Sequence, residues 1–155
     1  MNVNSYTKRA SQVAFFLLRV VAGFLFMQAG SVILFGWFGG MPGGVKSPPP
    51  LLSLMWIGGV LEFFGGIAIM LGLATHPVAF ILSGQMAVAY WKFHSSLATP
   101  WPVQNNGMAA VLLCFIFLYL AAQGGGEWSL DALIRRKRER ATGAIRASTL
   151  KEAER

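Results

Sequence analysis

Charged residues are scarce in this chain of 155 residues, where Asp, Glu, Lys and Arg together make up 12%. Soluble domains carry about a quarter charged residues, so the composition excludes an ordinary water-soluble fold. Eight of the 13 Lys and Arg residues follow Leu133, which leaves five in the first 134 residues. Hydrophobic residues reach 55%, and the mean hydropathy is +0.55. The sequence therefore predicts a membrane protein with a basic tail.

Cysteine and histidine are also rare, with one Cys and two His in the chain. Cys114 lies in an apolar run, so an intrachain disulfide and a Cys-x-x-Cys motif are both excluded. A zinc or copper site needs several ligands at suitable spacing, and Cys114 has no such neighbours in the sequence. The sequence also lacks a Ser/His/Asp set and a phosphate-binding loop, so we expect no catalytic residue and no metal ligand.

Four apolar stretches predict four transmembrane helices, at residues 13–35, 51–73, 77–93 and 107–123. The first two have 23 residues each, which suffices to cross a bilayer. Lys8 and Arg9 precede the first stretch as in a signal peptide, but the stretch is longer than a signal core and no clear cleavage site follows, so we expect a retained helix. The predicted fold is all-α, with a four-transmembrane-helix bundle over residues 1–126 and a cytoplasmic tail over residues 127–155.

The tail predicts a helix that lies in the membrane interface. Ser129 suits the N-cap, and Trp128 and Leu133 are placed as a hydrophobic staple. A basic run follows, made of Arg135, Arg136, Lys137, Arg138 and Arg140. Basic side chains at this position meet anionic lipid, whereas a nucleic-acid binder spreads them over a folded face. We therefore expect membrane lipids and no nucleic acid as partners, and a mobile polar chain beyond Ala141.

Four spans place both termini on one side of the membrane, and the basic residues at both ends predict that this side is the cytoplasm. His76 follows the second span and is then cytoplasmic, whereas His94 follows the third and is external. The two imidazoles cannot ligate one haem within the chain. Redox cofactors, if the function needs them, are expected on partner proteins.

Glu62 is expected near the bilayer midplane, 11 residues from either end of its span. An ionised carboxylate there is costly, so it must be paired, protonated or facing a wet cavity. Arg19 lies about 9 Å and Glu62 about 16 Å from the cytoplasmic ends of their helices, a gap that an Arg side chain can bridge. Two interpretations stay open: a buried ion pair that only fixes helix pairing, or a polar site that binds a ligand or moves a proton.

Glycines surround both charged residues. Gly58, Gly59, Gly65 and Gly66 stand three or four residues from Glu62, and Gly23 and Gly30 share a face with Arg19. Since small residues let helix backbones approach closely, we expect the first two helices to meet along these faces. Gln28 and Gln85 are weaker candidates for ligand contacts, because a buried amide more often bonds a neighbouring helix. Lys92 and His94 are expected to be interfacial anchors.

The order of these motifs resembles the DoxX family of small four-helix membrane proteins, over about residues 16–133. LLRVVAGFLFMQAG is similar to the first helix of that family and GGVLEFFGGIAIMLGL to the second. MAVAYW, WPVQNNG and AAVLLCFIFLYLAAQGGGEWSLDAL resemble the third helix, the outer loop and the fourth helix. The sequence departs from the family pattern at Ala29 and Ile33, where many relatives have a His and a Lys, and at Met108, where they often have an acid.

The resemblance implies a bacterial inner-membrane protein linked to quinone chemistry, because named relatives are subunits of quinone-reducing or quinol-oxidising complexes. We therefore expect a subunit that supports a quinone-linked oxidoreductase through a pocket near Glu62 and Arg19, with Glu62 as proton acceptor, Arg19 as charge stabiliser and Gln85 as a third contact. The rival expectation is a structural subunit that binds partner helices through its glycine faces. Assembly of the chain into a homo-oligomer is a further possibility. Transport is disfavoured, since four short helices leave little room for a pore.

Overall fold

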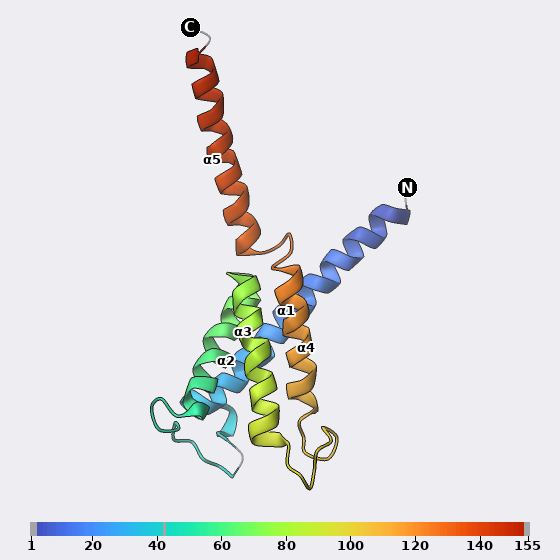
Figure 1. The fold of residues 1–155 in the computed structure, drawn as a ribbon, viewed down its shortest axis with the longest axis vertical. Coiled ribbons are helices and arrows are strands. Elements are labelled where there is room, and N and C mark those ends of the chain that lie inside the picture. Colours follow the sequence, from blue (N-terminus) through green and yellow to red (C-terminus); the bar gives the residue numbers. More distant parts are fainter. Residues whose placement is uncertain (1–2, 42, 154–155) are drawn as a thin grey trace.

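The computed structural model describes residues 3–41 and 43–153. Within them the chain is all-α and contains five α-helices: α1 (Val3–Phe35), α2 (Leu54–Leu71), α3 (Thr75–Ala89), α4 (Met108–Gln123) and α5 (Leu130–Ala153). A 3-10 helix η1 (Trp37–Gly39) follows α1, and a π-helical turn η2 (Tyr90–His94) extends α3. Helices α1 to α4 form one bundle, and α5 and the first turns of α1 extend from the same end of it (Figure 1).

The first four helices coincide in order and place with the predicted spans, although their ends differ. Helix α1 begins at Val3, earlier than predicted, because the polar residues before Val13 include no Gly or Pro to end a helix. Two helices, over Tyr6–Phe35 and Leu54–Leu71, are long and apolar enough to cross a membrane, and α4 is a shorter apolar helix. The described chain thus has two to three apolar helices of membrane length.

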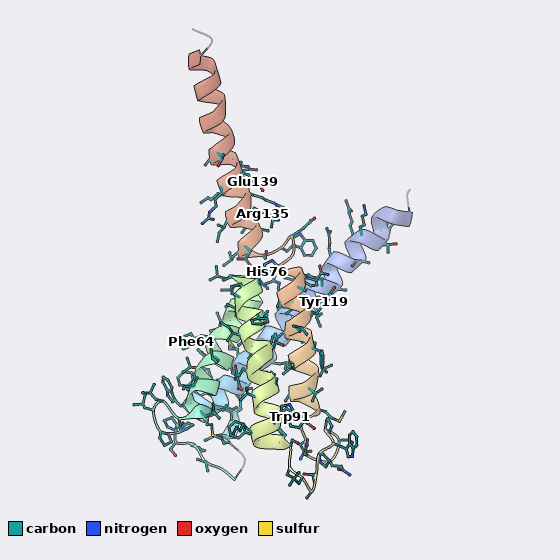
Figure 2. All side chains as sticks on the ribbon, in the orientation of Figure 1. Phe64, His76, Trp91, Tyr119, Arg135 and Glu139 are labelled. Carbon is teal, nitrogen blue, oxygen red and sulfur yellow. The ribbon has the colours of Figure 1, made fainter. Side chains whose placement is uncertain are left out.

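Large apolar side chains cover the outside of the bundle. Phe24 on α1, Phe64 on α2, Phe80 on α3 and Phe115 on α4 each expose between 43% and 67% of their surface. Phe64 points away from the bundle (Figure 2). The acidic side chain of Glu62, in contrast, is buried. Helices that are apolar on their exposed faces are suited to lipid rather than water.

The centre of the bundle is filled by side chains from all four helices. Phe26 of α1 stacks edge-on against Phe117 of α4, with ring centroids 4.8 Å apart. Ile69 of α2, Leu82 of α3 and Leu120 of α4 are at most 1% exposed. These apolar contacts fix the positions of the four helices relative to one another.

Close contact between α1 and α2 depends on two glycine pairs. A side chain at Gly23 would collide with the backbone of Gly66, and one at Gly30 would collide with the backbone near Gly59. Small residues of this kind let helix backbones approach without intervening side chains. The predicted meeting of the first two helices is confirmed for these four glycines.

Gly58 and Gly65 serve a different contact from the one we predicted. A side chain at Gly58 would lie beside the amide of Gln85, and one at Gly65 would collide with Leu82. Both neighbours belong to α3, so the expectation that these two glycines face α1 was wrong. Adjacent positions on a helix point about 100° apart, and the two glycine sets of α2 therefore face two different helices.

The tail forms a longer helix than predicted. Ser129 is the N-cap as expected, since its Oγ accepts a hydrogen bond from the Ala132 N–H at 3.1 Å. Helix α5 then continues to Ala153, where we expected a mobile chain beyond Ala141, because the tail is rich in good helix formers. It points away from the bundle (Figure 1) and does not lie across its end as predicted. Residues 154–155 of the predicted tail lie outside the described residues.

Candidate functional site

A cavity of about 520 Å³ lies between the four bundle helices. Its walls come from the second half of α1, the first half of α2, the second half of α3 with η2, and the first turns of α4. These segments meet at the end of the bundle where the α1–α2 and α3–α4 connections lie (Figure 1). The lining side chains are apolar apart from Glu62, Gln85 and His94.

Glu62 and Gln85 form the polar wall of this cavity. Gln85 Nε2 donates to Glu62 Oε1 and to the carbonyl of Gly58, each at 3.1 Å. Because a carbonyl only accepts hydrogen bonds, the Gly58 contact assigns which amide atom is the nitrogen. Gln85 Oε1 is buried and has no hydrogen bond within the described residues. The structure thus brings two of the predicted ligand contacts together.

Arg19 belongs to a second site, at the C-terminal end of α2. Its Nη1 donates to the carbonyls of Ile69 and Met70, both at 2.8 Å, and its Nη2 donates to the carbonyl of Trp128 at 2.6 Å. The last carbonyls of a helix lack intrahelical partners and attract a cation. For this reason the expectation that Arg19 bridges to Glu62 was wrong.

The other predicted residues lie apart from the cavity. Gln28 is half-buried on α1 and is not among the cavity residues, and its carbonyl accepts a bond from Ser31 Oγ at 2.6 Å. The basic run of α5 is exposed. Across the described residues the one ion pair joins Arg135 to Glu139 on α5, at 4.0 Å (Figure 2). The same part of the chain has no cluster of three His, Cys, Asp or Glu side chains that could hold a metal ion.

His94 reaches the cavity wall through the π-helical turn. The Ser95 N–H donates to the Tyr90 carbonyl at 2.8 Å, five residues back as in a π-helix. His94 Nδ1 lies 3.1 Å from the carbonyl of Asn105, so Nδ1 carries the proton. Tyr90 Oη also donates to the Pro100 carbonyl at 2.6 Å, which ties the α3–α4 loop to η2. Sequence reasoning missed this placement, because a single π turn leaves no signal in hydrophobic periodicity.

Asp131 joins the start of α5 to the α2–α3 turn, and sequence reasoning missed it. Its carboxylate accepts bonds from the N–H groups of Ala74 and Thr75 at 2.7 and 2.8 Å, and from Thr75 Oγ1 at 2.8 Å. Partial burial raises the pKa of Asp131, but these hydrogen bonds outweigh it and hold the pKa below its usual value. An acidic residue in the first turn of a helix is a sequence signal for the N-terminus of that same helix. Nothing in the sequence indicates that Asp131 instead accepts hydrogen bonds from the N-terminus of α3.

Comparison with known proteins identifies relatives that cover most of the chain. The DoxX family profile matches residues 14–95, which include Arg19, Glu62 and Gln85. An uncharacterized protein of Haemophilus influenzae is 36% identical over 118 residues, which are 74% of this chain and 85% of that protein. Inner membrane protein YqjF of Escherichia coli is 31% identical over 140 residues, 84% of this chain and 98% of that protein. No solved structure gives a significant match. By its profile match and these relatives, the chain belongs to the DoxX family.

Proposed function

We propose that this chain is a bacterial inner-membrane protein that crosses the membrane four times, through α1 to α4, with both termini in the cytoplasm. The exposed Phe side chains on each of these helices support lipid contact on all sides. Helix α3 and η2 together cover residues 75–94, about 30 Å of helix. The relative from Escherichia coli is named an inner membrane protein. The positive-inside rule then places the basic α5 in the cytoplasm.

We further propose that the cavity binds a quinone-type amphiphile. The protein then acts as a subunit that supports a quinone-linked oxidoreductase, whose redox cofactors are held by partner subunits. The observation that carries it is the Gln85–Glu62 hydrogen bond set in the wall of a cavity that is otherwise apolar. A bound quinone supplies two-electron redox chemistry. The chain's own groups orient it, and Glu62 Oε2, which has no hydrogen bond within the described residues, can accept or hold a proton.

The cavity suits such a ligand in size and in access. Its volume of about 520 Å³ lies in the usual range for small-molecule sites. Leu25, Leu54 and Phe93 line it while remaining more than half exposed, so an apolar tail can enter from the lipid side. Ala29 and Ile33, at the positions where the family resemblance implies a His and a Lys, also line it. In this chain the polar contacts are therefore left to Glu62, Gln85 and His94.

Bound quinone, measured by mass spectrometry after mild extraction from native membranes, tests the proposal. Gln85→Leu and Glu62→Gln should each lower the quinone recovered per folded chain. Gln28→Leu is the matched control, because it removes the same amide from a position outside the cavity and should leave the quinone unchanged. The proposal fails if the wild type carries no quinone, or if the two cavity variants keep as much as the control.

The alternative is a structural subunit that binds partner helices through its glycine faces. Gly23, Gly30, Gly59 and Gly66 already pack between α1 and α2 of the same chain, so these four contribute to the bundle itself. Partner subunits recovered without quinone, together with a mild effect of Glu62→Gln on assembly, would favour this alternative over the quinone site.

A further inference from the structure

A groove of about 380 Å³ lies where the start of α5 meets α1 and the end of α2. Apolar side chains form most of its wall, including Phe16, Met70, Leu71, Leu130 and Leu133. Its charged members are Arg19, Arg136 and Glu127. We propose that this groove is a discrete binding site for one anionic phospholipid, whose phosphate is held between Arg19 and Arg136. The site is separate from the cavity at Glu62.

The buried charge of Arg19 is the first argument for an anion here. Arg19 is only 1% exposed, and its hydrogen bonds go to three neutral carbonyls. Its Nε is buried and has no hydrogen bond within the described residues. Asp131 attracts it electrostatically, but within the described residues the two side chains form no ion pair, and the carboxylate bonds instead to Ala74 and Thr75. A buried cation without a close anion is costly, and a phosphate in the adjoining groove would offset that cost.

Arg136 provides the second, accessible charge. It is exposed on α5 and lines the same groove as Arg19. Glu127 is also exposed there and opposes an anion, so the three groups together leave one positive charge. Arg presents several N–H donors in a planar arrangement that matches phosphate oxygens. The groove therefore favours a phosphate headgroup that is negative overall over a zwitterionic or cationic one.

The apolar surroundings favour a lipid over free phosphate. Leu71, Leu133 and Trp128 border the groove and are each at least half exposed. Trp128 also packs edge-on against Phe16, with ring centroids 5.6 Å apart. Tryptophan and basic side chains gather where headgroups meet acyl chains, and α2 ends at Leu71 in this groove. An acyl chain can cover these apolar side chains while its phosphate meets the two arginines.

Native mass spectrometry of the full-length protein in detergent tests the site, with dioleoylphosphatidylglycerol as the probe and dioleoylphosphatidylcholine as the zwitterionic comparison. Arg136→Gln should weaken binding of the first phosphatidylglycerol about tenfold, the worth of one charge-assisted contact. Arg138→Gln is the matched control, because Arg138 is also exposed on α5 but lines a different hollow; it should leave the first binding step unchanged. The Arg19 Nε–H resonance of protein labelled with ¹⁵N at arginine should shift with phosphatidylglycerol and not with phosphatidylcholine.

Three results would overturn the inference. Equal weakening by Arg136→Gln and Arg138→Gln would indicate diffuse attraction along the basic helix. Equal binding of the two lipids would show that the net negative charge of the headgroup is not recognised. Displacement of phosphatidylglycerol by millimolar inorganic phosphate would show a free-anion site. None of these results bears on quinone recovered from the Glu62 cavity, so the two proposals stand or fall separately.

Discussion

Arg19 and Glu62 are both buried, but their partners differ in kind. Within the described residues, Arg19 donates hydrogen bonds only to main-chain carbonyls at the end of α2 and at Trp128, whereas Glu62 accepts one from a side-chain amide in a cavity wall. By bonding to main-chain carbonyls, Arg19 fixes α1 against the end of α2 and the segment that precedes α5. A carboxyl beside a cavity is instead placed to meet a ligand.

Arg19→Met should lower stability while leaving the Glu62 cavity intact. The change leaves three carbonyls without their donor, and we expect a loss of about 3 kcal/mol in the free energy of unfolding. Thermal unfolding in detergent would measure this. Folded Arg19→Met protein should keep the quinone content of the wild type, whereas Gln85→Leu should lose quinone with a smaller change in stability. Quinone loss from folded Arg19→Met protein would contradict the separation of the two sites.

Docking of α5 through Asp131 should be sensitive to acid. The pKa of Asp131 is lower in the folded protein than in the unfolded chain, where it is about 3.9. The ionised carboxylate therefore stabilises the folded protein above about pH 3.9, and this stabilisation is lost as the pH falls through the folded-state pKa. Hydrogen exchange at the Ala74 and Thr75 amides, corrected for intrinsic rates, should accelerate below about pH 4. Asp131→Ala should show the fast exchange at neutral pH already. Equal protection in the variant and the wild type at neutral pH would argue against this role.

Helices α1 and α2 pack closely, because glycine backbones replace side chains at their crossing. Gly84 on α3 provides a contrast, since a side chain there would meet nothing within 4 Å. A substitution at Gly66 therefore tests a contact inside the chain, whereas one at Gly84 tests a contact with lipid or with a partner protein.

Gly66→Leu should prevent normal packing of α1 against α2, because the new side chain would collide with backbone atoms of Gly23 and Met27. The loss in the free energy of unfolding should exceed the ~1–3 kcal/mol that one overpacked core position costs. We therefore expect little folded protein on size exclusion. Gly84→Leu should yield folded monomer in normal amounts. If Gly84→Leu instead releases partner proteins from the extracted complex, α3 is part of their interface. Normal folding of Gly66→Leu would contradict the described crossing.

At the scale of elements, apolar runs separated by loops were sufficient to predict α1 to α4, and Ser129 with the Trp128–Leu133 staple was sufficient to predict the cap of α5. They did not predict the partner of Arg19, because a long side chain can reach toward either end of its helix and the free carbonyls of α2 are not marked in the sequence. They predicted Gln85 as a contact of the pocket near Glu62 but not its hydrogen bond to Glu62, since this depends on how α3 is rotated about its axis. Asp131 and His94 were missed because their partners lie in other elements or in an irregular turn.

At the scale of the molecule, the two candidate sites lie at two different levels of the bundle. The Glu62 cavity lies toward the connections α1–α2 and α3–α4, and the Arg19 site lies at the end from which α5 extends (Figure 1). If four helices span the membrane, these levels belong to opposite halves of the bilayer. A ligand of the cavity and a lipid in the α5 groove would then not compete.

Cysteine labelling in cells tests this arrangement directly. In a Cys114→Ser background, Leu97→Cys in the α3–α4 loop should react with a membrane-impermeant maleimide from the periplasmic side. Thr142→Cys on α5 should react only after the membrane is opened. Both positions are exposed, so access rather than burial decides the result. Labelling of both from the same side would exclude four spans with cytoplasmic ends.

The α2–α3 turn consists of Gly72, Leu73 and Ala74 alone. Gly72 has a positive φ of 66°, and a side chain there would collide with Arg19 and Ser129. An added peptide at this turn would displace the start of α5 and the cap of α3 together. The chain therefore cannot accept an inserted segment or affinity tag at this turn, and any lengthening of the protein on this side has to occur at its two ends.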